Sequence, residues 1–383
     1  MTDAPAISEE LQVNLGTITF KELMQAVHAF KPNKACGPDM QPIEYWKVIL
    51  ENGSKEAVDW LLLLCNSAWE LKEMPQSWHL SRVVCIFKKG DPGDCKNYRP
   101  ICLLNAAYKI FAMIVFRRLK DAGADACIQA SQFGFRPKRS TEDALHCARR
   151  AVERAFADRG GCLHLLALDW QMAFDSINPA AMINALRRFG LPPHICQVVQ
   201  AIYSERHFRV SDTGQTSAEH LQFSGICQGC PLSPFLFVMV MTVLMHDAVA
   251  NLEPAAAEAY RAGRLYDLLY ADDTLILGTN AQDIAQFAAV VERMGANYGM
   301  SLHWGKTQAL SILSADRILQ PDGSPMTEVS EMKYLGAVLD GHGRSDSEIS
   351  RKLGCAKGAF RELSKLWSHA AVTTKDKLRF STP

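Results

Sequence analysis

Leu268-Leu269-Tyr270-Ala271-Asp272-Asp273-Thr274-Leu275-Ile276-Leu277 is the stretch that decides the fold. It places two adjacent acids between two short apolar runs, each long enough for a buried strand, so we predict a hairpin over residues 265–278 with the acids at its tip. Carboxylates walled by Leu and Ile are costly to keep ionised unless a positive charge lies close by. A divalent metal ion, which prefers hard oxygen ligands, is the simplest occupant of such a site.

A third carboxylate follows another apolar run upstream. Residues 163–169 read as a buried strand that ends in Asp169. Two Mg²⁺ ions about 4 Å apart can clamp the attacking 3′-hydroxyl and the leaving pyrophosphate of a nucleotide transfer. Such a pair of ions needs carboxylates that converge from neighbouring strand ends, and Asp169 and Asp272 meet that requirement.

Further blocks follow one another in a fixed order over residues 30–365. In chain order they are Lys34-Ala35-Cys36-Gly37-Pro38-Asp39, Ile86-Phe87-Lys88-Lys89-Gly90-Asp91 with Asn97-Tyr98-Arg99-Pro100-Ile101, Gln132-Phe133-Gly134-Phe135-Arg136, Gly225-Ile226-Cys227-Gln228-Gly229-Cys230-Pro231-Leu232-Ser233-Pro234, Tyr270 to Asp273, Lys306-Thr307 and Tyr334-Leu335-Gly336. Together they resemble the reverse transcriptase domain of a non-LTR (LINE-type) retrotransposon polyprotein. The first block is typical of that branch of the family.

The resemblance implies an α+β right-hand polymerase with fingers, a palm whose antiparallel sheet packs on helices, and an incomplete helical thumb. The expected division is an N-terminal tail over 1–19, fingers with an N-terminal extension motif over 20–160, a palm over 161–339 and the start of a truncated thumb over 340–383. For the palm we expect two helices on one face of the sheet. Its expected strands include 206–212 and 308–313, followed by a strand over 333–339 and a helix over 347–367.

The resemblance also assigns the catalytic groups. Asp169 and Asp272 would bind two Mg²⁺ ions, for which Mn²⁺ is a possible substitute, and Asp273 would support the site. The backbone carbonyl of Trp170 would contribute to the ion that travels with the triphosphate. Lys306 is a candidate general acid that gives a proton to the departing pyrophosphate, although a surface lysine after a turn fits the same pattern.

A second group of residues would bind the nucleotide. Phe174 falls at the family's sugar gate, where an aromatic ring excludes the 2′-hydroxyl that separates ribonucleotides from deoxyribonucleotides; ordinary core packing is the alternative. Arg99, with Lys88 or Lys89, would neutralise the triphosphate, or these residues form a solvated basic turn. Gln228 and Gly229 would lie beside the nascent base pair, where a glycine leaves the backbone unhindered.

Several positions bear on the choice between polymerase classes. Tyr334, Leu335 and Gly336 resemble the primer grip, in which a tight turn presents backbone to the primer end. Asp175 stands where RNA-dependent RNA polymerases accept the 2′-hydroxyl, but the Gln228-Gly229 pair is not their pattern, and DNA synthesis is favoured. Met172 and His303 depart from the residues usual in the family.

Composition places the chain among ordinary globular proteins. Of 383 residues 48% are hydrophobic and 21% charged, and no apolar run reaches the roughly 18 residues of a membrane span. The N-terminus carries acids and no basic stretch, unlike a secretory signal. Twelve cysteines at irregular spacings indicate free thiols in a reducing compartment. We expect no membrane partner and an intracellular protein, nuclear if it acts at chromosomal DNA.

The formal net charge is zero, which argues weakly against nucleic-acid binding because phosphates call for a basic surface. The charge is unevenly distributed, however. Residues 82–120 hold nine Lys or Arg against two Asp, and residues 341–383 hold nine against four acids. Two basic segments suit a groove for nucleic acid, whereas two solvated helix faces are the alternative.

The leading hypothesis is an RNA-directed DNA polymerase that extends a DNA 3′-end on an RNA template with deoxynucleoside triphosphates. A catalytically inactive retroelement fragment that only binds nucleic acid is an alternative, favoured by the short C-terminal region. A group II intron maturase-like reverse transcriptase is another, but residues 34–39 argue against it. The sequence leaves the oligomeric state open.

Overall fold

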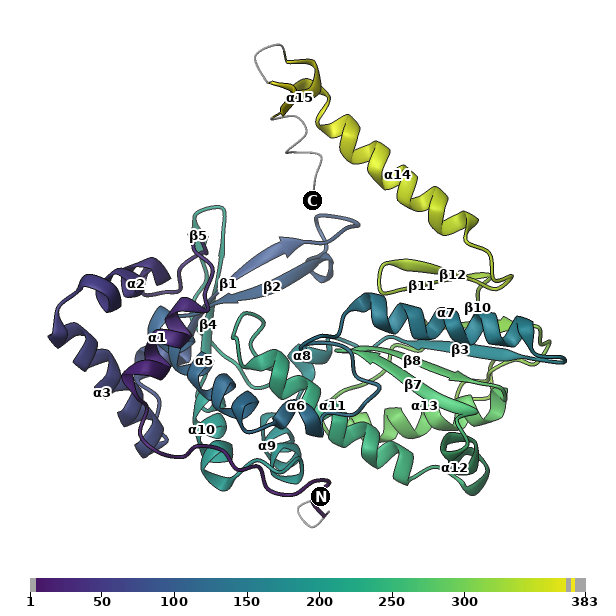
Figure 1. The fold of residues 1–383 in the computed structure, drawn as a ribbon, viewed down its shortest axis with the longest axis horizontal. Helices are drawn as coiled ribbons and strands as arrows, with labels where there is room; N and C mark the ends of the chain where they lie inside the picture. The colour runs from purple at the N-terminus through teal and green to yellow at the C-terminus, as the bar shows by residue number, and fades with distance from the viewer. Residues whose placement is uncertain (1–4, 370–372, 376–383) are drawn as a thin grey trace.

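The computed structural model describes residues 5–369 and 373–375. Two larger sheets and a two-stranded hairpin are surrounded and joined by helices (Figure 1). The mixture of helices with a mainly antiparallel central sheet confirms the expected α+β polymerase class.

The sheet that carries the predicted acids has the order β10-β9-β3-β8-β7. Its strands are β3 (Leu163–Leu168), β7 (Leu265–Tyr270), β8 (Asp273–Gly278), β9 (Gln308–Ile312) and β10 (Thr327–Glu328). All neighbours are antiparallel except β10 and β9. The predicted hairpin and both flanking strands are therefore confirmed.

Both faces of this sheet are covered. Leu163 and Leu165 of β3 lie in a cluster with α7 (Thr141–Ala157), whereas Leu166 and Leu168 lie in the main core with α11 (Ser233–Ala250) and α13 (Ala281–Ala296). Side chains alternate between the faces of a strand, so burial on both sides explains why β3 reads as one continuous apolar run. The two helices expected on one face are α11 and α13, and α7 covers the other face in addition.

Helix α11 is the central helix of the core. It is long and apolar enough to cross a membrane by length and composition alone, but 72% of its apolar window is buried inside the protein. A helix that is apolar on all sides is stable in a soluble fold when its neighbours cover every side. Here α9 (Pro179–Arg188), α12 (Pro254–Arg261) and α13 pack around it.

The second large sheet lies beside the N-terminal helices (Figure 1). Its strands are β1 (Leu80–Phe87), β2 (Tyr98–Leu103), β4 (His207–Asp212), β5 (Gln215–Thr216) and β6 (His220–Leu221). β4 pairs in parallel with β1, Leu80 lying opposite His207. Residues 206–212 were expected in the palm sheet; that placement was wrong, because they pair with the strand that precedes the basic turn.

Helices pack around this second sheet and between the two sheets. They are α1 (Phe20–His28), α2 (Ile43–Asn52), α3 (Lys55–Leu71), α4 (Gln76–His79), the 3₁₀ turn Cys95–Asn97, α5 (Ala106–Asp121), α6 (Ala124–Cys127), α8 (Ala173–Ser176) and α10 (Pro193–Tyr203). Thr19 caps α1 in a capping box with Glu22, as the Thr-Phe-Lys-Glu pattern predicts.

Residues 5–19, expected as a tail, form an extended strap across the molecule. The strap binds α9 and the residues after it through Ile7 N to Arg188 O and Leu11 N to Gly190 O, both 2.8 Å. Farther along, Arg118 of α5 is 3% exposed, pairs with Glu22, and donates to the carbonyls of Asn14, Gly16 and Thr17. The strap thus ties α9 to α5 through main-chain atoms.

The C-terminal part begins with a hairpin and ends in a projecting helix. β11 (Glu331–Tyr334) and β12 (Ala337–Asp340) form an antiparallel pair, so the expected single strand over 333–339 was wrong. α14 (Asp346–Glu362) extends away from the body and is followed by α15 (Ser364–Ser368), which divides the helix expected over 347–367 (Figure 1). Glu348 fastens α14 to the hairpin by accepting from Val338 N at 3.0 Å.

Candidate active site

Strand register brings the three predicted acids together. Leu168, the last residue of β3, lies opposite Thr274 of β8, so Asp169 directly after β3 faces the start of β8. Asp273 opens β8 opposite Tyr270, and Asp272 stands in the turn between them. The acids therefore meet at one edge of the sheet, because antiparallel neighbours place the end of one strand beside the start of the next.

The three acids repel one another. Burial raises the pKa of Asp272, the charge of Asp169 raises it further, and the guanidinium of Arg99 partly offsets both effects. Exclusion of water by surrounding protein atoms, with the charges of Asp272 and Asp169, raises the pKa of Asp273 to about 6. No salt bridge in the described part of the chain involves these acids. The charge of Arg99 therefore acts on Asp272 without forming an ion pair with it.

These acids fit a divalent cation that is completed by substrate. Within residues 5–369 and 373–375, no group of three or more His, Cys, Asp or Glu side chains is arranged so that it could hold a metal ion by itself. Mg²⁺ usually binds one or two carboxylates and takes its remaining oxygens from water and phosphate. The unpaired acids and the raised pKa values of Asp272 and Asp273 match that donor set, because a bound cation would relieve the repulsion.

The segment around residue 303 supports Asp169 through its backbone. His303 N donates to Asp169 O at 2.7 Å, and Gln171 N donates to Ser301 O at 2.9 Å. Because the contact at residue 303 uses a backbone N–H, the departure at His303 does not remove it. Lys306 is exposed on the turn that follows and makes no side-chain hydrogen bond or ion pair with another described residue.

The Trp170 side chain links the end of β3 to β8. Its indole Nε1 donates to Thr274 Oγ1 at 3.2 Å, and its ring lies where a Cβ on Gly295 would come within 2.5 Å. The side chain is therefore buried and structural, which leaves only its backbone carbonyl for the predicted contribution to a metal. Met172, the other departure, is 74% exposed and contributes no packing to the site.

Phe174, five residues after Asp169, stands in an aromatic stack. Its ring stacks on Phe237 of α11 with centroids 4.3 Å apart, and Phe135 meets it edge-on at 6.5 Å. Phe174 is only half-buried, so part of its side chain is accessible to solvent. The structure therefore shows the packing of Phe174 on α11, while the sugar-gate role stays a prediction.

Asp175 binds Gln228, a contact that sequence reasoning missed. Gln228 Nε2 lies 3.1 Å from both carboxylate oxygens of Asp175. Burial raises the pKa of Asp175, while the bond from Gln228 and the charge of Lys88 lower it. Asp175 is thus engaged in orienting Gln228.

Two glycines let the Gln228 loop approach its neighbours. A Cβ on Gly225 would lie 2.7 Å from the Asp175 backbone, and one on Gly229, whose φ is +136°, would lie 2.2 Å from Cys102 O. Cys102 N also donates to Gln228 O at 2.7 Å. These contacts join β2 to the loop, and they explain why glycine is needed at both positions.

The basic turn faces the acids only in part. Arg99 of β2 and Lys88 after β1 are exposed, and their charges act on Asp272 and Asp175 respectively. Lys89 is exposed and forms no ion pair in the described residues. The structure therefore brings Arg99 and Lys88 toward the acids, while nothing distinguishes Lys89 from a solvated lysine.

Tyr334, Leu335 and Gly336 form the tip of the β11–β12 hairpin. Tyr334 pairs with Ala337, and φ is +47° at Leu335 and +77° at Gly336. Two positive φ values in a two-residue loop define the tight turn expected here, and a Leu in that conformation is strained. The Tyr334 side chain is buried, and Asp273 is among the charges that raise its pKa, so the turn stands near the acids.

The block at residues 34–39 closes over the start of α5. A Cβ on Gly37 would lie 2.3 Å from the backbone of Leu104, and Asp39 Oδ2 accepts from Ala106 N at 2.9 Å. The glycine permits close approach and the acid caps a helix end. Close packing and helix capping therefore account for Gly37 and Asp39 of this block.

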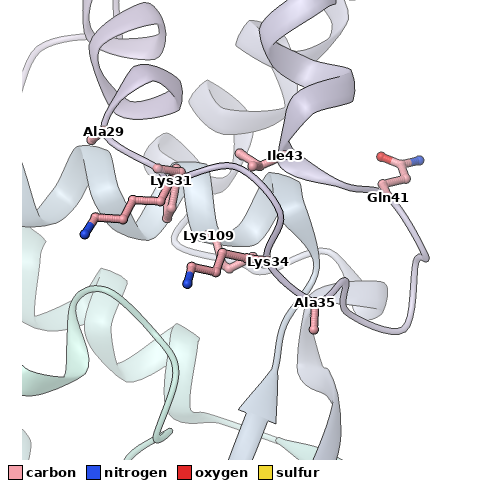
Figure 2. A pocket seen from close by; sticks show the side chains of 8 residues that line it. Ala29, Lys31, Lys34, Ala35, Gln41, Ile43 and Lys109 are labelled. Carbon is pink, nitrogen blue, oxygen red and sulfur yellow. The ribbon is translucent and has the colours of Figure 1, made fainter. Parts of the chain in front are cut away.

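A pocket of about 220 Å³ lies beside this block. Figure 2 shows Lys31, Lys34 and Lys109 around it, together with the apolar Ala35 and Ile43. Burial lowers the pKa of Lys109, an effect that nearby Asp39 partly offsets. The three ammonium groups form no salt bridge in the described chain, and none of the predicted catalytic residues lines the pocket.

Comparisons with known proteins agree with one another. The family model described as reverse transcriptase (RNA-dependent DNA polymerase) matches residues 86–339. The chain is 26% identical over 349 residues to the RNA-directed DNA polymerase from mobile element jockey of Drosophila melanogaster, an alignment that covers 86% of this chain and 36% of that protein.

Two further relatives come from other animals. The Transposon TX1 uncharacterized 149 kDa protein of Xenopus laevis is 27% identical over 345 residues, covering 88% of this chain and 25% of that protein. A Retrovirus-related Pol polyprotein from type-1 retrotransposable element R2 of Popillia japonica is 25% identical over 308 residues, covering 75% and 42%. The chain spans less than half the length of these relatives.

Proposed function

Because this chain belongs to the reverse transcriptase (RNA-dependent DNA polymerase) family, we propose that it is the polymerase region of a non-LTR retrotransposon protein and extends a DNA 3′-end on an RNA template. One observation carries the proposal: Asp169, Asp272 and Asp273 meet at adjacent strand ends without a basic partner. Seven sequence blocks and curated relatives among mobile elements support it.

The acids define the reaction centre in this proposal. Reverse transcriptases normally use divalent metal, and Asp169 and Asp272, with Asp273 in support and the Trp170 carbonyl nearby, would hold two Mg²⁺ ions that lower the pKa of the primer hydroxyl and offset charge on the leaving pyrophosphate. Arg99 and Lys88 would bind the triphosphate from the facing strands, with Lys89 as a further candidate. Lys306 is a candidate proton donor, since its turn follows residues that pair with the Asp169 backbone.

Sugar and base selection would rest on the Phe174 stack and the Gln228 loop. The half-buried ring of Phe174, held by Phe237, would exclude a 2′-hydroxyl. Gln228, held by Asp175, would lie along the incoming nucleotide with Gly229 next to the template. Asp175 is engaged by an amide, which supports deoxynucleotides as substrates over ribonucleotides.

The two segments rich in Lys and Arg, residues 82–120 and 341–383, would bind template and primer. Residues 20–160 would act as fingers, 161–339 as palm with the turn at Tyr334–Gly336 near the primer end, and 340–383 as the beginning of a thumb. Lys31, Lys34 and Lys109 would add phosphate contacts. Arg118 is excluded from this role because it is buried in the strap. Action on chromosomal DNA would require a nuclear location.

Primer extension tests the proposal directly. Purified protein would be given an RNA template with an annealed DNA primer, Mg²⁺ and deoxynucleotides, and Asp272→Asn would serve as the control. Metal-dependent extension by the wild type that is lost in the control supports the polymerase. Salt-dependent binding of the duplex without any extension would contradict it and would favour a fragment that only binds nucleic acid.

A further inference from the structure

Gln132 clamps the turn that carries two of the three acids. This fully buried side chain accepts at Oε1 from Ala271 N at 2.9 Å and from Gly134 N at 2.8 Å. Its Nε2 donates to Ala271 O at 3.3 Å. One amide side chain therefore satisfies both the N–H and the C=O of Ala271, the residue directly before Asp272.

Ala271 needs such support because of its backbone conformation. Its φ is +57°, a left-handed value that residues with a Cβ adopt infrequently. The turn has short strands on both sides and is therefore free to take other shapes unless something outside the hairpin holds it. A buried donor and acceptor that bind the N–H and the C=O of one residue fix the two peptide units on either side of it, since leaving either buried group unpaired is costly.

The segment that carries Gln132 is itself fixed to β7. Leu269 N donates to Ser131 O at 2.9 Å, and Phe133 N donates to Leu269 O at 2.8 Å, so residues 131–133 run beside the strand like a short parallel neighbour. Gly134 completes the contact, because a Cβ there would lie 2.4 Å from Ala271 N. Arg136 anchors the far side of the segment by donating to Gln129 O and Asp125 O.

We propose that Gln132 is a positioning residue, which holds Ala271 in its left-handed conformation and thereby sets where the Asp272 and Asp273 carboxylates lie. The inference rests on the proposed polymerase function and deepens it. Gln132 has no contact with the reacting atoms; it acts through the backbone N–H and C=O of Ala271. The Gln-x-Gly spacing within residues 132–134 follows from the geometry, since the glutamine supplies the clamp and the glycine the space for the turn.

Hydrogen exchange of single amides tests the clamp without any need for activity. In Gln132→Met, which keeps a long buried side chain but removes both polar atoms, the Ala271 amide should exchange about tenfold faster, the scale of one lost buried hydrogen bond. Gln129→Met is the matched control: it removes an amide from the same segment that binds Asp267 instead of the turn, and Ala271 exchange should not change. Unchanged exchange in Gln132→Met would overturn the proposal.

The consequence for the site is tested by metal binding and by kinetics. For Gln132→Met we expect weaker Mn²⁺ binding by electron paramagnetic resonance, a higher Mg²⁺ requirement and a lower kcat, with the KM for deoxynucleotide unchanged. A purely structural role would lower the amount of active protein without moving the Mg²⁺ requirement, and that result would contradict the inference. Gly134→Ala is the second variant in case Gln132→Met folds poorly. Its added Cβ would displace Ala271, and we expect the same weaker Mn²⁺ binding, higher Mg²⁺ requirement and lower kcat.

The two proposals fail in different ways. A wild-type protein that neither binds Mn²⁺ nor extends a primer contradicts the polymerase function, whatever happens at residue 132. A wild-type protein that does both, with Gln132→Met identical to it in exchange and in Mg²⁺ requirement, contradicts only the positioning role.

Discussion

Gln228 Nε2 lies 3.1 Å from each carboxylate oxygen of Asp175, and this contact joins the loop that carries Gln228 to the helical turn α8, which follows Asp169. Two residues separated by 52 others along the chain thus form one unit. An acid in a position that could read a ribose hydroxyl is instead occupied with orienting an amide. Under the proposed function, nucleotide binding would depend on this pair of side chains, whose mutual contact the sequence did not predict.

Asp175→Asn tests that pair. The Asn side chain keeps the size but loses the charge that strengthens the bond from Gln228, so we expect the KM for deoxynucleotide to rise by about tenfold, the scale of one charge-assisted hydrogen bond. Gln228→Ala should raise KM by a similar factor, and the double variant should cost no more than either single change. Fully additive effects in steady-state kinetics would show that the two residues act separately.

Asp272→Asn should abolish synthesis without harming the fold. Removal of one metal-binding charge is expected to lower extension by about 10³-fold or more, a loss of several kcal/mol of transition-state stabilisation. Because burial and Asp169 already disfavour the charged form of Asp272, a neutral Asn should leave the melting temperature unchanged or slightly higher. Robust extension by this variant would show that the metal assignment is wrong.

Phe174→Ala should admit ribonucleotides. Loss of the ring opens space beneath the sugar, and we expect relative ribonucleotide use to rise by about 10- to 100-fold. The same change breaks the stack on Phe237 and should cost about 1–3 kcal/mol of stability. Phe237→Leu is the control for packing: it removes the support and keeps the ring. Unaltered sugar selectivity in Phe174→Ala would place the gate elsewhere.

Metal binding should weaken as the pH falls through about 6. The pKa of Asp273 is raised to about 6, so its carboxyl becomes protonated below that pH and a cation must then compete with the proton. Metal binding is therefore expected to be tighter at higher pH. Mn²⁺ titrations between pH 5 and 8 should show this change in the wild type and a smaller one in Asp273→Asn. Equal pH dependence in both proteins would assign the transition to another group.

The sequence predicted the acids and their strands well because the relevant signals are local. Each acid directly follows or opens an apolar strand, and antiparallel pairing of such strands brings the acids together without further information. The same reasoning failed over residues 333–339, where a strained left-handed Leu335 breaks the strand. The pattern of apolar residues does not predict that a leucine adopts a left-handed backbone conformation.

Long-range pairings account for the other misses. β4 was assigned to the wrong sheet because its parallel partner β1 lies more than 100 residues earlier, and no local pattern encodes that choice. Gln132 was recognised as part of a block, but its partners are backbone groups of Ala271. Backbone partners have no residue type, so a sequence pattern does not reveal them.

The strap over residues 5–19 has a practical consequence for work on this protein. Phe20, where the first helix begins, is an inviting start for a shortened expression clone. Such a clone would strip hydrogen-bond partners from the buried Arg118 guanidinium and uncover α9. The link that the strap makes between α9 and α5 would then be lost. Reduced activity of the shortened protein would follow from the loss of this link and would give no information about Asp169, Asp272 and Asp273.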